Sequence, residues 1–214
     1  MAKKKSARKP AAAKRPTTSS TTRSKSAVKP SALEAPSTRA MATRNAGRKK
    51  PAAAKPAAPA WPREGSKAPD FTTVAHDGAS VRLSAFKGRP VVLYFYPKDD
   101  TPGCTVEACG FRDAHTQFSR HKAVVLGVSP DSPRSHVKFR EKHGLPFTLL
   151  ADENHVVAEK YGAWRAKSMY GKSFMGIVRS TFVIDGAGRI ARAFTTVKPQ
   201  GHEREVLAAV AALE

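Results

Sequence analysis

The sequence predicts an α/β domain with a central, partly parallel sheet, preceded by a disordered basic tail. Two observations support this prediction. Strand-like and helix-like segments alternate over residues 65–214, and this alternation is typical of a sheet that is covered by helices. Residues 1–64, in contrast, consist mainly of Ala, Lys, Arg, Pro, Ser and Thr. Because 214 residues suffice for one domain of ordinary size and an appendage, we expect one folded unit over residues 65–214.

The tail carries most of the formal net charge of +21. Residues 1–66 hold 17 Lys or Arg and two acids, a balance of +15, whereas residues 67–214 hold 21 Lys or Arg and 15 acids, a balance of +6. Bulky apolar side chains are scattered in the tail, so it cannot bury enough apolar surface to offset the entropy of ordering it. No apolar run in the chain approaches the roughly 18 residues that span a bilayer, and we expect a soluble protein.

The domain is expected to begin with a hairpin. Residues 70–74 and 80–83 are short strand-like runs, and Asp77-Gly78 between them is a turn signal. A buried strand is predicted next, at residues 91–96, because the run Val-Val-Leu-Tyr-Phe-Tyr is continuously apolar.

The remaining elements follow in alternation. Strands are predicted at residues 123–129, 148–151 and 181–185, and helices at residues 104–120, 132–143, 156–161 and 202–213. In the first helix, Phe111, Ala114 and Phe118 recur at helical spacing and provide an apolar face for the sheet.

The segment between the buried strand and the first helix contains both cysteines of the chain. Thr101 is suited to the N-cap and Pro102 to the first helical position, which places Cys104 in the first turn. The backbone N–H groups and the helix dipole at that position favour a thiolate over a thiol. Two aspartates just before the helix act in the opposite direction, so a cation is required nearby.

Cys109 follows Cys104 by five residues. On an ideal helix this spacing separates the Cα atoms by roughly 8 to 9 Å, whereas a disulfide needs them within about 7 Å. If the two sulfurs pair, the first turns of the helix must therefore unwind. We favour a redox pair over inert thiols or a metal site, because zinc needs four ligands and neither a second cysteine pair nor suitably spaced histidines are present.

The run Pro97-x-x-x-Thr101-x-x-Cys104 resembles the active-site motif of the peroxiredoxins. Residues 101–113 and 173–185 are similar to the bacterioferritin comigratory protein, or peroxiredoxin Q, branch of that family, and the resemblance extends from about residue 65 to residue 213. It implies a thioredoxin-like fold with a central mixed sheet flanked by helices. It also implies that neither a metal nor an organic cofactor takes part.

The resemblance implies a role for five residues. Cys104 would attack a hydroperoxide as the peroxidatic cysteine, and Cys109 would convert the resulting sulfenic acid into a disulfide that a thioredoxin-like dithiol reduces. Arg179 would be the required cation, Thr101 would hydrogen-bond the reacting oxygens, and Pro97 would shield the pocket from water. We expect a monomer that acts as a thiol peroxidase.

Some of these residues have purely structural interpretations. A strand-edge arginine such as Arg179 is usually a solvated charge, Thr-Pro is an ordinary helix start, and a proline often follows a strand. Glu107 is expected to be a helix-surface acid near the amino-terminal end, where the helix dipole favours it.

Three interpretations of the tail remain open. Its spaced cations, as in Lys3-Lys4-Lys5 and Arg48-Lys49-Lys50, are typical of non-specific DNA binding, but a flexible solubilising extension and an organelle transit peptide also fit. The alternative to a peroxidase is therefore a histone-like DNA-binding protein with a protective domain. A general disulfide oxidoreductase is a weaker alternative, because Cys-x-x-Cys is missing. We expect a cytoplasmic, nucleoid-associated location, or the nucleus or an organelle in a eukaryote.

Overall fold

The computed structural model describes residues 60–169 and 171–213. The disorder predicted for the tail falls almost entirely on residues 1–59, which lie outside the described residues. Within the described ranges, no helix is both long and apolar enough to cross a membrane.

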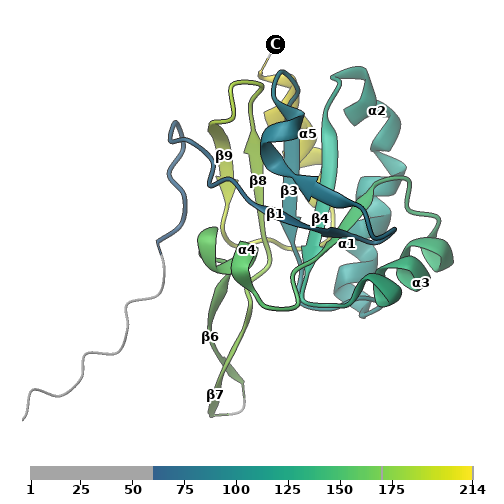
Figure 1. Ribbon diagram of the computed structural model, residues 1–214, viewed down its shortest axis with the longest axis vertical. Helices are drawn as coiled ribbons and strands as arrows, with labels where there is room; N and C mark the ends of the chain where they lie inside the picture. The colour runs from purple at the N-terminus through teal and green to yellow at the C-terminus, as the bar shows by residue number, and fades with distance from the viewer. Residues whose placement is uncertain (1–59, 170, 214) are drawn as a thin grey trace, which may run out of the picture. The chain divides into compact units, whose positions relative to one another are not determined.

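A seven-stranded mixed sheet lies at the centre of the domain, with the strand order β2-β1-β5-β4-β3-β8-β9 (Figure 1). Neighbouring strands β3, β4 and β5 run parallel, and the other neighbours run antiparallel. The predicted partly parallel sheet is therefore confirmed. The strands are β1 Thr72–Ala75, β2 Ser80–Arg82, β3 Val91–Phe95, β4 Val124–Ser129, β5 Thr148–Ala151, β8 Ser180–Ile184 and β9 Ile190–Phe194.

The predicted hairpin of β1 and β2 is present and antiparallel. Gly78 has a φ of 84°, a conformation that glycine adopts without steric cost. The Asp77 carboxylate accepts a hydrogen bond from the Ala79 backbone N–H at 3.0 Å. Local turn chemistry thus accounts for the hairpin.

Helices cover both faces of the sheet because side chains along β3 alternate between two apolar clusters. Leu93 and Phe95 belong to one cluster, which includes residues of α4, while Val92 and Tyr94 belong to the other, which includes residues of α1, α2, α3 and α5. The helices are η1 Leu83–Phe86 (a 3-10 helix), α1 Pro102–Asp113, α2 His115–Arg120, α3 Pro133–His143, α4 Val156–Lys160 and α5 His202–Ala211.

The helix predicted at residues 104–120 is divided into α1 and α2 at Ala114. The Gln117 N–H donates to the Ala114 carbonyl at 2.9 Å, a bond over three residues that tightens the turn. Phe111 and Phe118 nevertheless pack with ring centroids 5.9 Å apart, so both helices bury the predicted apolar face.

A second, two-stranded sheet consists of β6 Trp164–Met169 and β7 Lys172–Ile177, which form an antiparallel hairpin. Figure 1 shows this hairpin projecting from the edge of the domain. No strand is predicted there from sequence, because its side chains form neither a long apolar run nor a strict alternation. Phe174 and Met175, for example, are adjacent and both exposed.

Candidate active site

Cys104 lies in the first turn of α1, as predicted. Thr101 occupies the N-cap position with extended backbone angles (φ −92°, ψ 151°), and Pro102 is the first helical residue. The Cys104 residue is only 1% exposed and belongs to the apolar cluster that also contains Tyr94 and Phe111. The sulfur is thus held on a rigid helix start, at the end where the helix dipole favours negative charge.

Arg179 is brought to Cys104 by the pairing of two strands that are distant in sequence. The antiparallel register of β3 and β8 pairs Phe95 with Ser180, so the start of β8 lies beside the end of β3. Arg179 immediately precedes β8, and its Nη2 donates a hydrogen bond to Cys104 Sγ at 3.2 Å. The cation that the sequence requires is therefore present, and its side chain is 14% exposed.

Glu107 is buried, and the expectation of a helix-surface acid is wrong. It lies three residues after Cys104, on the same face of α1, and only 1% of the residue is exposed. Its Oε2 accepts a hydrogen bond from Arg179 Nη1, while its Oε1 has no hydrogen-bond partner in the described part of the chain. The spacing of three residues on a helix is the signal that places it beside the thiol.

The charges of Glu107 and Arg179 depend on one another. Burial raises the pKa of Glu107 to about 7, although the neighbouring Arg179 acts to lower it. Burial would lower the pKa of Arg179, but the charge of Glu107 and the contact with Cys104 raise it above its ordinary value. Arg179 therefore stays a cation while Glu107 titrates near neutral pH.

Lys167 is a second cation near the site that sequence reasoning missed. Burial lowers the pKa of Lys167, and the charge of Arg179 lowers it further while that of Cys104 raises it. Lys167 lies on β6, opposite Phe174 of β7. Because the hairpin itself is not predicted from sequence, no local signal indicates this residue.

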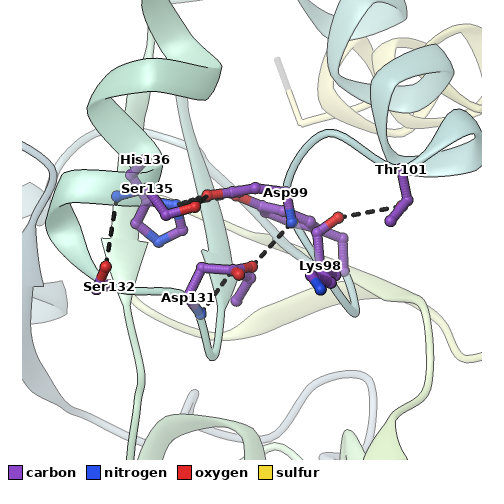
Figure 2. A network of polar contacts seen from close by, with 9 residues as sticks. Lys98, Asp99, Thr101, Asp131, Ser132, Ser135 and His136 are labelled. Carbon is purple, nitrogen blue, oxygen red and sulfur yellow. Dashed lines mark hydrogen bonds and ion pairs between the residues drawn. The ribbon is translucent and has the colours of Figure 1, made fainter.

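Thr101 and Pro97 lie on the segment that leads from β3 into α1. The Thr101 hydroxyl donates to the Lys98 carbonyl oxygen at 3.1 Å and makes no capping hydrogen bond (Figure 2). Pro97 is half-buried. The structure thus places Thr101 next to the helix start that carries Cys104, and the roles of Thr101 and Pro97 toward a peroxide stay predictions.

Cys109 lies on the same continuous helix as Cys104, and both thiols are free. The buried face of α1 consists of Cys104, Glu107, Ala108 and Phe111, so Cys109 lies at its border and is half-buried. An intact α1 keeps the two sulfurs apart, in agreement with the helical spacing.

The two aspartates before α1 have partners of their own. Asp100 accepts hydrogen bonds from Lys142 at 2.6 Å and from His143 at 3.0 Å, both at the end of α3. Asp99 is buried against the start of the same helix. Among the described residues, no group of three or more His, Cys, Asp or Glu side chains is placed to hold a metal ion.

Comparison with known proteins gives a consistent family. The family model described as the AhpC/TSA family matches residues 65–193. Peroxiredoxin Bcp of Bacillus subtilis is 52% identical over 143 residues, which cover 67% of this chain and 91% of that protein. Peroxiredoxin Bcp of Escherichia coli K12 is 45% identical over 145 residues, which cover 68% of this chain and 93% of that protein.

Solved structures have the same fold. Peroxiredoxin Q of Xanthomonas campestris superposes with a TM-score of 0.64 and 39% identity, over 66% of this chain and 90% of that one. Peroxidoxin BcpB of Mycobacterium tuberculosis superposes with a TM-score of 0.64 and 34% identity, over 72% of this chain and 99% of that one. The predicted thioredoxin-like fold with a mixed sheet flanked by helices is confirmed.

Proposed function

Because this chain belongs to the AhpC/TSA family, we propose that it is a thiol peroxidase that reduces hydrogen peroxide and organic hydroperoxides. The contact of 3.2 Å between Arg179 Nη2 and Cys104 Sγ is the observation that carries this proposal. A guanidinium and a helix start both act on one sulfur, and both favour the thiolate, which is the nucleophilic form of cysteine.

In the first step, the Cys104 thiolate attacks the terminal oxygen of the hydroperoxide. A sulfur–oxygen bond forms and the oxygen–oxygen bond breaks, so the sulfur is oxidised by two electrons to sulfenic acid. The leaving oxygen takes the electron pair, acquires a proton and departs as water or an alcohol. Arg179 stabilises the negative charge as it moves from the sulfur to the leaving oxygen, and the Thr101 hydroxyl hydrogen-bonds the reacting oxygens.

In the second step, Cys109 attacks the oxidised sulfur of Cys104. A disulfide forms and the hydroxyl group leaves as water. The two sulfurs can approach one another only if the first turns of α1 unwind. A thioredoxin-like dithiol then reduces the disulfide by thiol exchange, and α1 re-forms. The burial of the two cysteines supports this order. Cys104 is buried and shielded from a large partner while α1 is intact, whereas Cys109 is only half-buried.

The direct test is peroxide consumption coupled to thioredoxin and its reductase. The full-length protein is expected to turn over, and Cys104→Ser to have no activity above the background. Cys109→Ser is expected to complete one turnover and stop. Full turnover by Cys104→Ser would remove this residue from the mechanism.

The tail supports a second, separate function in DNA binding. Its balance of 17 Lys or Arg against two acids is suited to phosphate neutralisation, whereas aromatic side chains for base stacking are absent before Trp61. The protein would then be a cytoplasmic monomer stationed near the nucleoid. A histone-like protein with a protective peroxidase domain is the alternative weighting of the same two functions.

Deletion of residues 1–59 separates the two functions. The shortened protein is expected to keep the peroxidase activity and to lose binding to random-sequence duplex DNA. Binding by the full-length protein should weaken steeply with salt, because each neutralised phosphate releases a counterion. Equal DNA binding by both proteins would assign the tail another role. The oligomeric state is tested separately, by light scattering of the full-length protein, which should give the mass of a monomer.

A further inference from the structure

A buried polar network fixes the segment that precedes the reactive helix. Residues 96–101 leave the end of β3 and lead into α1, and they carry Thr101 at its N-cap. Figure 2 shows Asp99 of this segment pointing toward Ser135 and His136. The reaction proposed above uses neither Asp99 nor any of the side chains that bond it.

The Asp99 carboxylate accepts hydrogen bonds from three side chains. Its donors are the Tyr96 hydroxyl at 2.8 Å, the Ser135 hydroxyl at 2.7 Å and His136 Nδ1 at 2.9 Å. Asp99 is 6% exposed and His136 is 0% exposed. A buried carboxylate with this many donors is satisfied, and removing any one of them is costly.

The backbone of Asp99 is held as firmly as its side chain. Its N–H donates to Asp131 Oδ2 at 2.8 Å, and the same oxygen accepts from the Ser129 hydroxyl at 2.7 Å. Asp131 lies between β4 and α3, and Ser135 and His136 lie in the first turns of α3. Asp99 therefore holds the segment before α1 at two points, to the β4–α3 connection through its backbone and to α3 through its side chain.

The hydrogen bonds of His136 indicate which of its nitrogens carries the proton. Nδ1 faces the Asp99 carboxylate, whereas the buried Nε2 has no hydrogen-bond partner in the described part of the chain. A proton on Nδ1 alone satisfies Asp99 and leaves Nε2 as a bare acceptor.

From this geometry we propose that Asp99 is a positioning residue for the peroxide-reactive site. Its hydrogen bonds to Ser135 and His136 fix the backbone path of residues 97–101. They thereby determine the positions of Thr101 and Cys104 relative to Arg179. The inference rests on the proposed peroxidase function, because it assigns Asp99 no chemistry of its own.

The hydrogen bonds of Asp99 also define where unwinding of α1 stops. None of its hydrogen-bond partners lies in α1, because Tyr96 precedes the helix, Asp131 lies in the β4–α3 connection, and Ser135 and His136 lie in α3. The helix can unwind for disulfide formation while Asp99 stays fastened, so Thr101 returns to the same place when α1 re-forms.

Asp99→Asn tests the proposal in the full-length chain. An amide has one acceptor oxygen in place of two and presents N–H groups to the donors of Asp99. The substitution therefore disrupts these hydrogen bonds with little change in side-chain volume. The rate constant for the first peroxide turnover, measured by rapid mixing in a Cys109→Ser background, is expected to fall by about 10- to 100-fold. The matched control is Asp100→Asn, because the Asp100 side chain is 46% exposed and its loss should change the rate by less than about twofold.

A second readout separates positioning from a general loss of stability. The rate of Cys104 alkylation by iodoacetamide, followed against pH in the same background, should reach its half-maximum at higher pH in Asp99→Asn than in Asp100→Asn. A merely structural residue would lower the melting temperature and leave this profile unchanged at temperatures where the protein is folded. An unchanged turnover rate together with an unchanged profile overturns the proposal.

The remaining outcomes are also decisive. If Asp99→Asn does not fold, Ser135→Ala removes one donor from the carboxylate, and a smaller decrease in rate supports the proposal while an unchanged rate overturns it. If the unmodified protein does not react with peroxide, the proposed function fails. The alkylation profiles then still decide whether Asp99 positions Cys104.

Discussion

The guanidinium of Arg179 donates a hydrogen bond to the Cys104 sulfur over 3.2 Å, although 75 residues separate the two in the sequence. The same guanidinium reaches the buried carboxylate of Glu107 through its other nitrogen. One planar cation thus contacts both the nucleophile and a buried acid, each through a different nitrogen, and this fixed geometry is the basis of the first prediction.

Arg179→Lys is expected to lower the second-order rate constant for peroxide reduction by about 10²- to 10³-fold. An ammonium is a point charge that cannot bond the sulfur and the Glu107 carboxylate with two fixed nitrogens. Stopped-flow measurement of the first turnover checks this expectation. The control is Arg192→Lys, an exposed residue 3.7 Å from Glu64, which should react like the unmodified protein; equal rates for the two variants would contradict the role of Arg179.

Local signals in the sequence were sufficient for the helix start. The N-cap position of Thr101, Pro102 as the first helical residue and Cys104 in the first turn depend on neighbouring residues only, and the structure has all three. The proximity of Arg179, in contrast, depends on the register of β3 and β8. Only the family resemblance indicates it, because no local pattern encodes a pairing between distant strands.

Burial by distant elements explains the errors. Glu107 looks like a surface acid because a charged residue is rarely buried without a partner, and its partner Arg179 comes from the start of β8. Asp99 likewise has its donors on α3. The β6–β7 hairpin was missed because its exposed side chains follow no apolar period, and Lys167 was missed with it.

Glu107→Gln is expected to change how stability depends on pH. Burial raises the pKa of Glu107 from its ordinary 4.5 to about 7, so the folded protein retains a proton that the unfolded chain releases between these values. Stability from this group is therefore lost as the pH rises from 4.5 to 7. The variant lacks this loss, so its free energy of unfolding should gain on the unmodified protein by roughly 3 kcal/mol across this range.

Denaturant unfolding at pH 5 and pH 8 measures this difference. Glu159→Gln, a substitution of an exposed glutamate on α4, is the control and should show the same difference from the unmodified protein at both pH values. A constant difference for Glu107→Gln as well would show that Glu107 is ionised throughout.

His202 makes the fold sensitive to acid. It is 2% exposed, and burial lowers its pKa below the ordinary 6.5, although Glu205 acts to raise it. The unfolded chain binds the proton first, so the stability that His202 contributes is present above pH 6.5 and is lost as the pH falls through the lower folded value. His202→Gln should therefore lose less stability between pH 7 and pH 5 than the unmodified protein, as measured by thermal unfolding.

The contacts of His202 bury its ring between α5, β8 and α1, and a second histidine serves as the control. Its Nε2 lies 2.9 Å from the Thr181 hydroxyl, and its ring packs edge-on against Phe111 of α1. His115→Gln, at a half-buried histidine on α2, is the control and should keep the full acid sensitivity. The same sensitivity in both variants would assign the acid transition to other groups.

Oxidation is expected to unwind the start of α1 and leave the segment before it in place. Both cysteines are free and lie on one continuous helix from Pro102 to Asp113. Five helical residues separate Cα atoms by roughly 8 to 9 Å, beyond the approximately 7 Å that a disulfide allows.

Backbone amides of residues 103–109 should therefore exchange hydrogen faster in the peroxide-treated protein than in the reduced one, as measured by mass spectrometry of peptides. The Asp99 amide, bonded to Asp131 at 2.8 Å, should keep its protection in both forms. Cys109→Ser cannot form the disulfide, so its exchange should not change upon oxidation to sulfenic acid. Equal exchange in the reduced and disulfide forms would mean that the sulfurs meet by another movement than unwinding of this helix.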